Sequence, residues 1–61
     1  MTEQNAFLTR EQAAHYLGVS VPTMARWASR SLGPSFYKFG RRTKYRLHDL
    51  EAFVETRRKP A

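Results

Sequence analysis

Apolar residues at helical spacing predict a short first helix near the start of the chain. Thr9 and Gln12 match a capping box, in which each side chain satisfies a free backbone N–H at the helix start. We therefore expect this helix to begin near Arg10 and to end at Gly18, a residue type suited to the left-handed conformation that closes helices. Its apolar stripe comprises Ala13, Ala14 and Leu17, at positions i, i+1 and i+4.

A second helix is predicted directly after that stop. Ser20 is a favoured N-cap residue, and Pro22 falls in the first turn, where its missing N–H would have no partner within the helix. Two short helices joined by a tight turn predict a helix-turn-helix. The apolar face of the second helix is expected to comprise Met24, Trp27, Ala28 and Ser31. The outward face is small, polar and basic, and comprises Pro22, Thr23, Ala25, Arg26, Ser29 and Arg30.

Two runs of strand-forming residues, 36–39 and 43–47, predict a β-hairpin after the helices. The three residues between the runs, Gly40, Arg41 and Arg42, would form its tip and project as a wing. Period-two alternation is expected to place on one face Tyr37, Phe39, Tyr45 and Leu47. The other face is expected to carry Lys38, Lys44 and Arg46.

A third helix is predicted over about residues 49–57, with acids in its early turns and bases at its end, an order that suits the helix dipole. Pro60 would stop this helix. Its apolar stripe comprises Leu50, Phe53 and Val54.

The order helix, helix, strand, strand, helix predicts a small single α+β domain, a winged helix-turn-helix. We expect residues 1–6 to form a flexible N-terminal arm, residues 7–58 the domain, and residues 59–61 a C-terminal tail. The predicted core comprises Leu8, Ala13, Leu17, Val19, Met24, Trp27, Phe39, Tyr45, Leu50 and Phe53.

The position of the charge adds a functional expectation. The formal net charge of the 61-residue chain is +6, and residues 21–46 contain seven bases and no acid. Aromatic residues interleaved with these bases indicate a folded basic surface that needs an anionic partner, rather than a basic tail. The seven bases are Arg26, Arg30, Lys38, Arg41, Arg42, Lys44 and Arg46.

Other functions find little support in the composition. A chain of 61 residues has no room for the cleft of an enzyme, and we expect neither catalysis, nor a metal, nor a cofactor. His15 and His48 are far apart in the sequence, and neither has the additional ligands that a metal site needs. The absence of cysteine fits a reducing cytoplasm, and the polar start is unlike a signal peptide, so a cytoplasmic location is expected.

Four segments resemble the AlpA/excisionase-type winged helix-turn-helix family, a compact relative of the MerR DNA-binding domain. The resemblance extends over about residues 7–56, and it implies a bacterial or phage protein associated with the nucleoid. It also implies that the second helix enters the major groove of double-stranded DNA and that the wing lies on the backbone or in the minor groove. Val21 and Pro22 replace bases common in the family, which predicts modest sequence specificity. His48 stands where the family often has a serine that caps the last helix, so this cap is expected to be weaker or to be supplied by Asp49. The matching segments are 16–20, Arg26 with Trp27, Gly33 with Pro34, and 38–53.

Proteins similar to this one are recombination directionality factors (excisionases) that bend attachment-site DNA, or small transcriptional regulators of mobile elements; the residues leave both roles open. A function of another class, a basic module that binds an acidic protein or RNA, also remains open. Opposite charges at Glu11 and at Arg41 and Arg42 suggest head-to-tail self-association of monomers on DNA, and an integrase is a possible partner. The expected DNA-binding residues are Ser20, Pro22, Thr23, Arg26, Arg30, Lys38, Arg41, Arg42 and Lys44.

Overall fold

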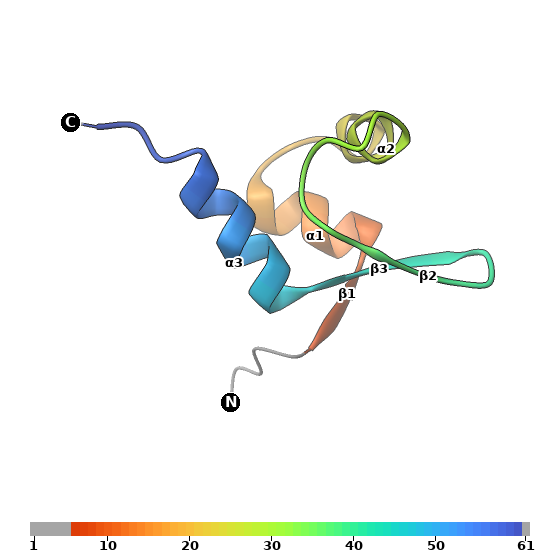
Figure 1. Cartoon of the computed structure of the whole chain (residues 1–61). Helices are drawn as coiled ribbons and strands as arrows, with labels where there is room; N and C mark the ends of the chain where they lie inside the picture. The colour runs from red at the N-terminus through yellow and green to blue at the C-terminus, as the bar shows by residue number, and fades with distance from the viewer. Residues whose placement is uncertain (1–5, 61) are drawn as a thin grey trace.

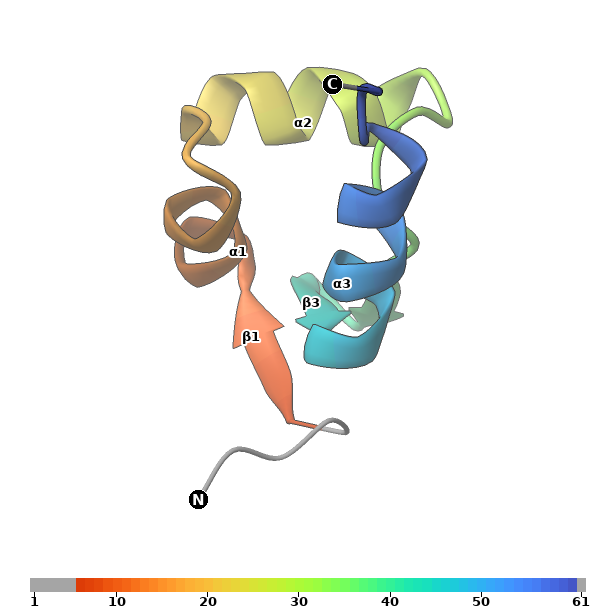
Figure 2. The ribbon, with the colours of Figure 1, turned by 90° about the vertical axis from the view of Figure 1, so that its left-hand side faces the viewer.

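The computed structural model, which describes residues 6–60, has three helices and one antiparallel three-stranded sheet (Figure 1). This confirms the predicted α+β winged helix-turn-helix and adds a short first strand that the sequence did not predict. In Figure 2, α2 crosses the top of the molecule, and α1 and α3 lie below it on opposite sides. The elements are β1 (Phe7–Thr9), α1 (Arg10–Leu17), α2 (Val21–Ser29), β2 (Tyr37–Phe39), β3 (Arg42–Arg46) and α3 (Leu47–Thr56).

The predicted caps of α1 are present. The Gln12 N–H donates to the Thr9 hydroxyl over 3.1 Å, and the Thr9 N–H donates to the Gln12 side-chain oxygen over 2.9 Å. At the other end Gly18 adopts the left-handed conformation (φ 74°), and the Val19 N–H donates back to the Ala14 carbonyl over 3.0 Å. These bonds form a Schellman motif, which closes α1 and turns the chain toward α2.

Helix α2 begins as predicted but ends earlier. Its cap is the Ser20 hydroxyl, which accepts the Thr23 N–H over 3.2 Å. The helix stops at Ser29, because Ser31 takes a left-handed conformation (φ 58°) and the Leu32 N–H donates back to the Trp27 carbonyl over 2.7 Å. The placement of Ser31 on the apolar helix face was therefore wrong, since this residue belongs to the closing turn.

The sheet has the order β1-β3-β2, and its register corrects the predicted faces of the hairpin. Phe39 pairs with Arg42 and Tyr37 pairs with Lys44, so the tip consists of two residues rather than the predicted three. Because directly paired residues share a face and neighbours alternate, a change of one residue in the turn exchanges the faces of one strand relative to the other. The inner face, toward the helices, carries Leu8, Lys38, Thr43 and Tyr45. The outer face carries Phe7, Thr9, Tyr37, Phe39, Arg42, Lys44 and Arg46.

Two predictions about the hairpin are therefore wrong. Tyr37 and Phe39 do not share a face with Tyr45, and Lys38 lies on the face opposite to Lys44 and Arg46. Phe39 is 53% exposed and does not belong to the core.

The core lies where α1 meets the inner face of the sheet. Tyr45 and Leu50 are fully buried there. Between α2 and α3, the ring centroids of Trp27 and Phe53 lie 5.5 Å apart. Val54, predicted to lie on the apolar stripe of α3, is instead 44% exposed. The buried core cluster comprises Ala13, Ala14, Met24, Tyr45 and Leu50, and the residues packed against it are Leu8, Leu17, Val19, Trp27 and Phe36.

Helix α3 follows β3 without a loop. Arg46 occupies its N-cap position and makes no side-chain cap bond, while Asp49 lies within the first turn rather than at the cap. The expected weak cap is thus present, and capping by Asp49 was wrong because the helix begins earlier, at Leu47. The Leu47 N–H instead donates to the Ala6 carbonyl over 3.0 Å. Of the predicted arm, residues 1–5 lie outside the described residues, and no helix within residues 6–60 is long and apolar enough to span a membrane.

Candidate nucleic-acid interface

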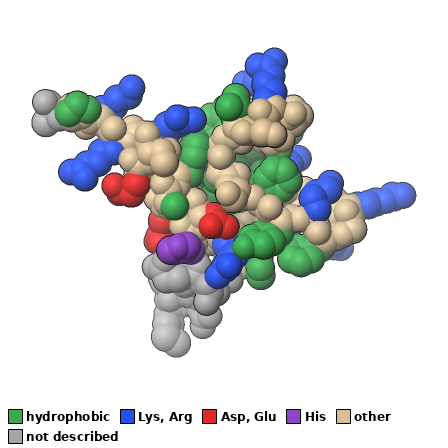
Figure 3. Space-filling model, in the orientation of Figure 1, with side chains coloured by type: hydrophobic (Ala, Val, Ile, Leu, Met, Phe, Trp, Pro, Cys, Tyr) green, Lys and Arg blue, Asp and Glu red, His purple; other side chains and the backbone are tan. Residues whose placement is uncertain are grey.

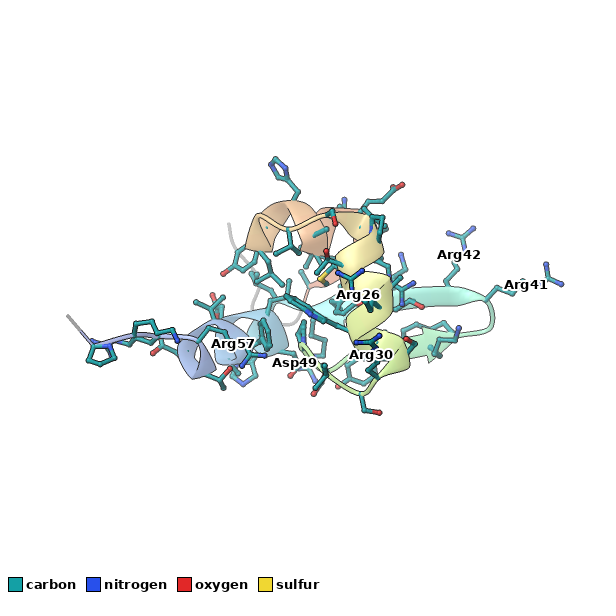
Figure 4. All side chains as sticks on the ribbon, turned by 90° about the horizontal axis from the view of Figure 1, so that it is seen from above. Arg26, Arg30, Arg41, Arg42, Asp49 and Arg57 are labelled. Atoms are coloured by element: carbon teal, nitrogen blue, oxygen red, sulfur yellow. The ribbon has the colours of Figure 1, made fainter. Side chains whose placement is uncertain are left out.

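The outward face of α2 carries a small network of polar side chains. The Ser20 and Thr23 hydroxyl oxygens lie 2.8 Å apart, and Arg26 Nη2 donates to the Thr23 hydroxyl over 3.4 Å. Pro22 precedes this network, and Arg30 lies one turn beyond Arg26 at the helix end (Figure 4). The network directs Arg26 along the exposed face while it also caps the helix, so Ser20 has a structural task as well as a candidate binding task.

The second basic group lies at the hairpin tip. Arg41 and Arg42 are exposed at the end of the hairpin that is remote from α3 (Figure 4). The tip is a two-residue turn of Gly40 and Arg41, and it displays both guanidinium groups without support from the core. Within residues 6–60, no ion pair engages a base of α2 or of the tip, so these charges are available to an external anion.

Two further residues predicted to bind DNA, Lys38 and Lys44, lie on opposite faces of the hairpin. Lys38 is on the inner face, beside α2, whereas Lys44 is on the outer face and pairs with Tyr37. Only Lys38 therefore continues the surface of α2 toward the tip.

A shallow groove runs between α2 and the hairpin. Its floor is made of small residues of α2, and Lys38 and Thr43 line its hairpin side. Arg10 also lines it, held by a hydrogen bond from its Nε to the Tyr45 hydroxyl over 3.4 Å. Two cations beside a hydroxyl suit a phosphate group. The lining residues are Arg10, Ala25, Ala28, Ser29, Phe36, Lys38 and Thr43.

Arg10 was missed in the sequence. Its position at the first residue of α1 gave it no link with the basic block of residues 21–46, and only β1, which pairs with β3, brings the start of α1 beside the hairpin. No local sequence signal could have revealed this proximity, because β1 is only three residues long.

The acids of the described residues lie outside α2 and the hairpin. Three of the four described acids, Asp49, Glu51 and Glu55, lie on α3, and Glu11 lies on α1. In Figure 3 the red side chains lie on the α3 side and in the centre, whereas blue side chains extend from the hairpin tip, from the top of α2 and from the C-terminal end beyond α3. The surface formed by α2, the groove and the tip is therefore basic throughout, which favours a polyanion.

The described residues do not show the side-chain clusters typical of a metal site. Within residues 6–60, no three histidine, cysteine, aspartate or glutamate side chains come together as they would around a metal ion. His15 and His48 are both exposed, on different helices.

Comparison with known proteins identifies the family of this fold. A search of curated proteins finds no match to the chain. The family model described as a helix-turn-helix domain matches residues 7–58. This match covers α1, the turn, α2, the hairpin and α3, and it agrees with the resemblance to AlpA/excisionase-like proteins, which the family includes. The chain therefore belongs to the helix-turn-helix domain family of small DNA-binding proteins.

Proposed function

We propose that this protein binds double-stranded DNA sequence-specifically, with α2 in the major groove and the hairpin tip on the adjacent backbone or in the minor groove. The observation that carries the proposal is the continuous, acid-free surface formed by α2, the groove and the tip. Family membership supports the same function. Lysine and arginine on such a surface neutralise phosphates and release counterions, which supplies affinity, while a few base-edge contacts supply specificity.

The residues of α2 have different tasks in this complex. Arg26 and Thr23 reach base edges, and Arg30 contacts bases or phosphate at the helix end. Ser20 caps the helix by accepting the Thr23 N–H, which fixes the start of α2 at the DNA surface. Pro22 lies against the groove wall without a donor of its own, and few side chains therefore read bases.

The hairpin and the groove bind the backbone. Lys38 and Arg10 hold a phosphate between α2 and the hairpin, and Arg41 and Arg42 follow the minor groove or its edges. Lys44, on the outer face, adds only long-range attraction or a contact with flanking phosphate.

The biological role that fits best is that of an excisionase, a recombination directionality factor that binds and bends attachment-site DNA. One helix and one tip cover few base pairs, so stable occupancy of a site needs several copies. Glu11 lies on α1 and Arg41 and Arg42 lie at the far end of the hairpin, which would let neighbouring monomers associate head to tail on direct repeats. Such an open array would bend its DNA and could present a surface to an integrase.

The test begins with selection of bound duplexes from a random pool, followed by titration of the full chain onto duplexes with one, two and three copies of the selected sequence. We expect salt-sensitive binding, affinity per repeat that rises with repeat number, and bending measured by fluorescence transfer between the duplex ends. Glu11→Gln should reduce the cooperativity without changing single-repeat affinity, and Glu51→Gln on α3 is the matched control.

Three results would contradict parts of this proposal. Equal affinity for all sequences would remove sequence specificity, and equal, independent affinity for each repeat would remove the array. A stable two-fold dimer without DNA, measured by sedimentation, would also remove the array. The role is tested separately: stimulation of excision by a purified integrase favours the excisionase, while repression of an adjacent promoter without such stimulation favours a transcriptional regulator of a mobile element.

A further inference from the structure

The outer face of the sheet carries an exposed aromatic cluster that DNA binding does not use. Phe7, Tyr37 and Phe39 are 49%, 38% and 53% exposed. Phe7 packs edge-on against the other two rings, with centroids 5.5 and 5.6 Å away. Tyr37 and Phe39 are nearly parallel to each other, with centroids 6.3 Å apart. In Figure 3, green surface lies along the lower side of the hairpin, the side remote from α2.

This cluster is not part of the core. Tyr45 and Leu8, which alternate with the exposed rings along the strands, face the helices instead. Because the cluster lies on the opposite side of the sheet from the groove beside α2, it stays accessible while α2 and the tip hold DNA. Three large aromatic side chains gathered in water on so small a protein are characteristic of an interaction site.

Cations flank the rings on the same face. Lys44 pairs with Tyr37 across the strands, and Arg46 Nη1 donates to the Tyr37 hydroxyl over 3.3 Å. This hydrogen bond raises the pKa of Arg46 above its usual value, and an arginine is charged at every physiological pH. No strand of the described sheet carries an acid.

We propose that this outer face docks an acidic segment of a partner protein, one that inserts apolar side chains over the aromatic cluster while its carboxylates meet the flanking bases. Apolar anchors surrounded by charge complementarity are the usual composition of a specific interface. The inference goes beyond DNA binding and does not depend on the role in excision.

The ring geometry favours a protein segment over single-stranded nucleic acid. Single-stranded nucleic acid binds aromatic side chains by stacking successive bases on open ring faces. Here Phe7 packs nearly at right angles against both Tyr37 and Phe39, with interplanar angles of 87° and 85°, so the three rings do not offer a series of parallel open faces. The rings thus form a packed apolar platform rather than separate stacking surfaces, which suits leucine-like or aromatic side chains.

The test uses a fluorescein-labelled peptide that alternates glutamate with leucine, titrated against the full chain. Two control peptides carry lysine in place of glutamate, or serine in place of leucine. We expect only the parent peptide to bind, with amide shifts in two-dimensional NMR spectra centred on Tyr37, Phe39 and Lys44. Phe39→Ser should weaken binding about tenfold. The matched control is Leu32→Ser, which changes a residue 51% exposed between α2 and β2 and should have no effect.

The variants also separate this site from the DNA surface. Phe39→Ser and, as a second variant, Phe7→Ser should retain their circular dichroism spectra and their affinity for duplex DNA. Equal peptide binding by parent, Phe39→Ser and Leu32→Ser chains would overturn the proposal. Stronger amide shifts on the outer face with oligothymidylate than with the peptide would assign it to single strands instead. Self-association that Phe39→Ser abolishes would assign it to a second copy of the chain.

Discussion

Gly33→Ala provides a sharp test of how α2 is held. Gly33 has φ +77°, and a Cβ atom there would lie 2.9 Å from Trp27 Cε3 and 3.0 Å from Trp27 Cβ. A shift of the indole would disturb its packing against the Phe53 ring, whose centroid lies 5.5 Å away. The left-handed backbone should cost about 1–2 kcal/mol and the overpacking about 1–3 kcal/mol, so the substitution should lower the free energy of unfolding by about 2–5 kcal/mol.

Gly18→Ala is the matched control for this experiment. Gly18 has nearly the same backbone conformation, φ +74°, but a Cβ atom there meets nothing within 4 Å. Only the backbone cost of about 1–2 kcal/mol should appear. Urea unfolding followed by far-ultraviolet circular dichroism measures both losses. If the two substitutions prove equally destabilising, the close approach of Gly33 to Trp27 does not constrain the fold, and this reasoning is wrong.

Four further changes test the interface and the core. Arg26→Ala should weaken cognate binding by about 1–3 kcal/mol more than random-sequence binding in fluorescence anisotropy; equal losses would indicate a phosphate contact only. Arg41→Ala with Arg42→Ala should flatten the salt dependence of DNA affinity by about one to two units, and an unchanged slope would exclude the tip. Trp27→Ala should cost about 3–5 kcal/mol and unfold most of the chain, as seen by circular dichroism; a folded, weaker binder would contradict this. Ser31→Gly should raise the denaturation midpoint by relieving a left-handed backbone cost of about 1–2 kcal/mol, and a lowered midpoint would count against that explanation.

Local signals in the sequence predicted most of the helical part correctly. The pair of Thr9 and Gln12, the stop at Gly18 and the cap at Ser20 are all present, because each depends on residues within one turn. The end of α2 was harder to predict, because serine is not a residue type that favours the left-handed conformation found at Ser31. That conformation exists because backbone bonds to the preceding turn stabilise it.

The hairpin faces depended on information that is not local. Glycine followed by two arginines is compatible with a turn of two or three residues, and the two choices place Phe39 on opposite sides relative to Tyr45. The choice depends on β1, whose pairing of Leu8 with Tyr45 requires that Tyr45 face the helices. A three-residue strand has too little pattern to be recognised in the sequence, so both the faces and the place of Arg10 beside the groove escaped prediction.

The short strand β1 also decides how the hairpin can move. Three-stranded pairing ends at Lys44, which faces both Thr9 and Tyr37; beyond it two residue pairs join β2 to β3. Two-stranded ribbons are marginal in water by themselves, and the one fully buried side chain of β3, Tyr45, lies on the clamped side of that limit. The hairpin is thus anchored at one end only, and its tip can bend without disturbing the core. In the complex proposed above, the tip would follow a minor groove whose width varies with base sequence while α2 stays in register.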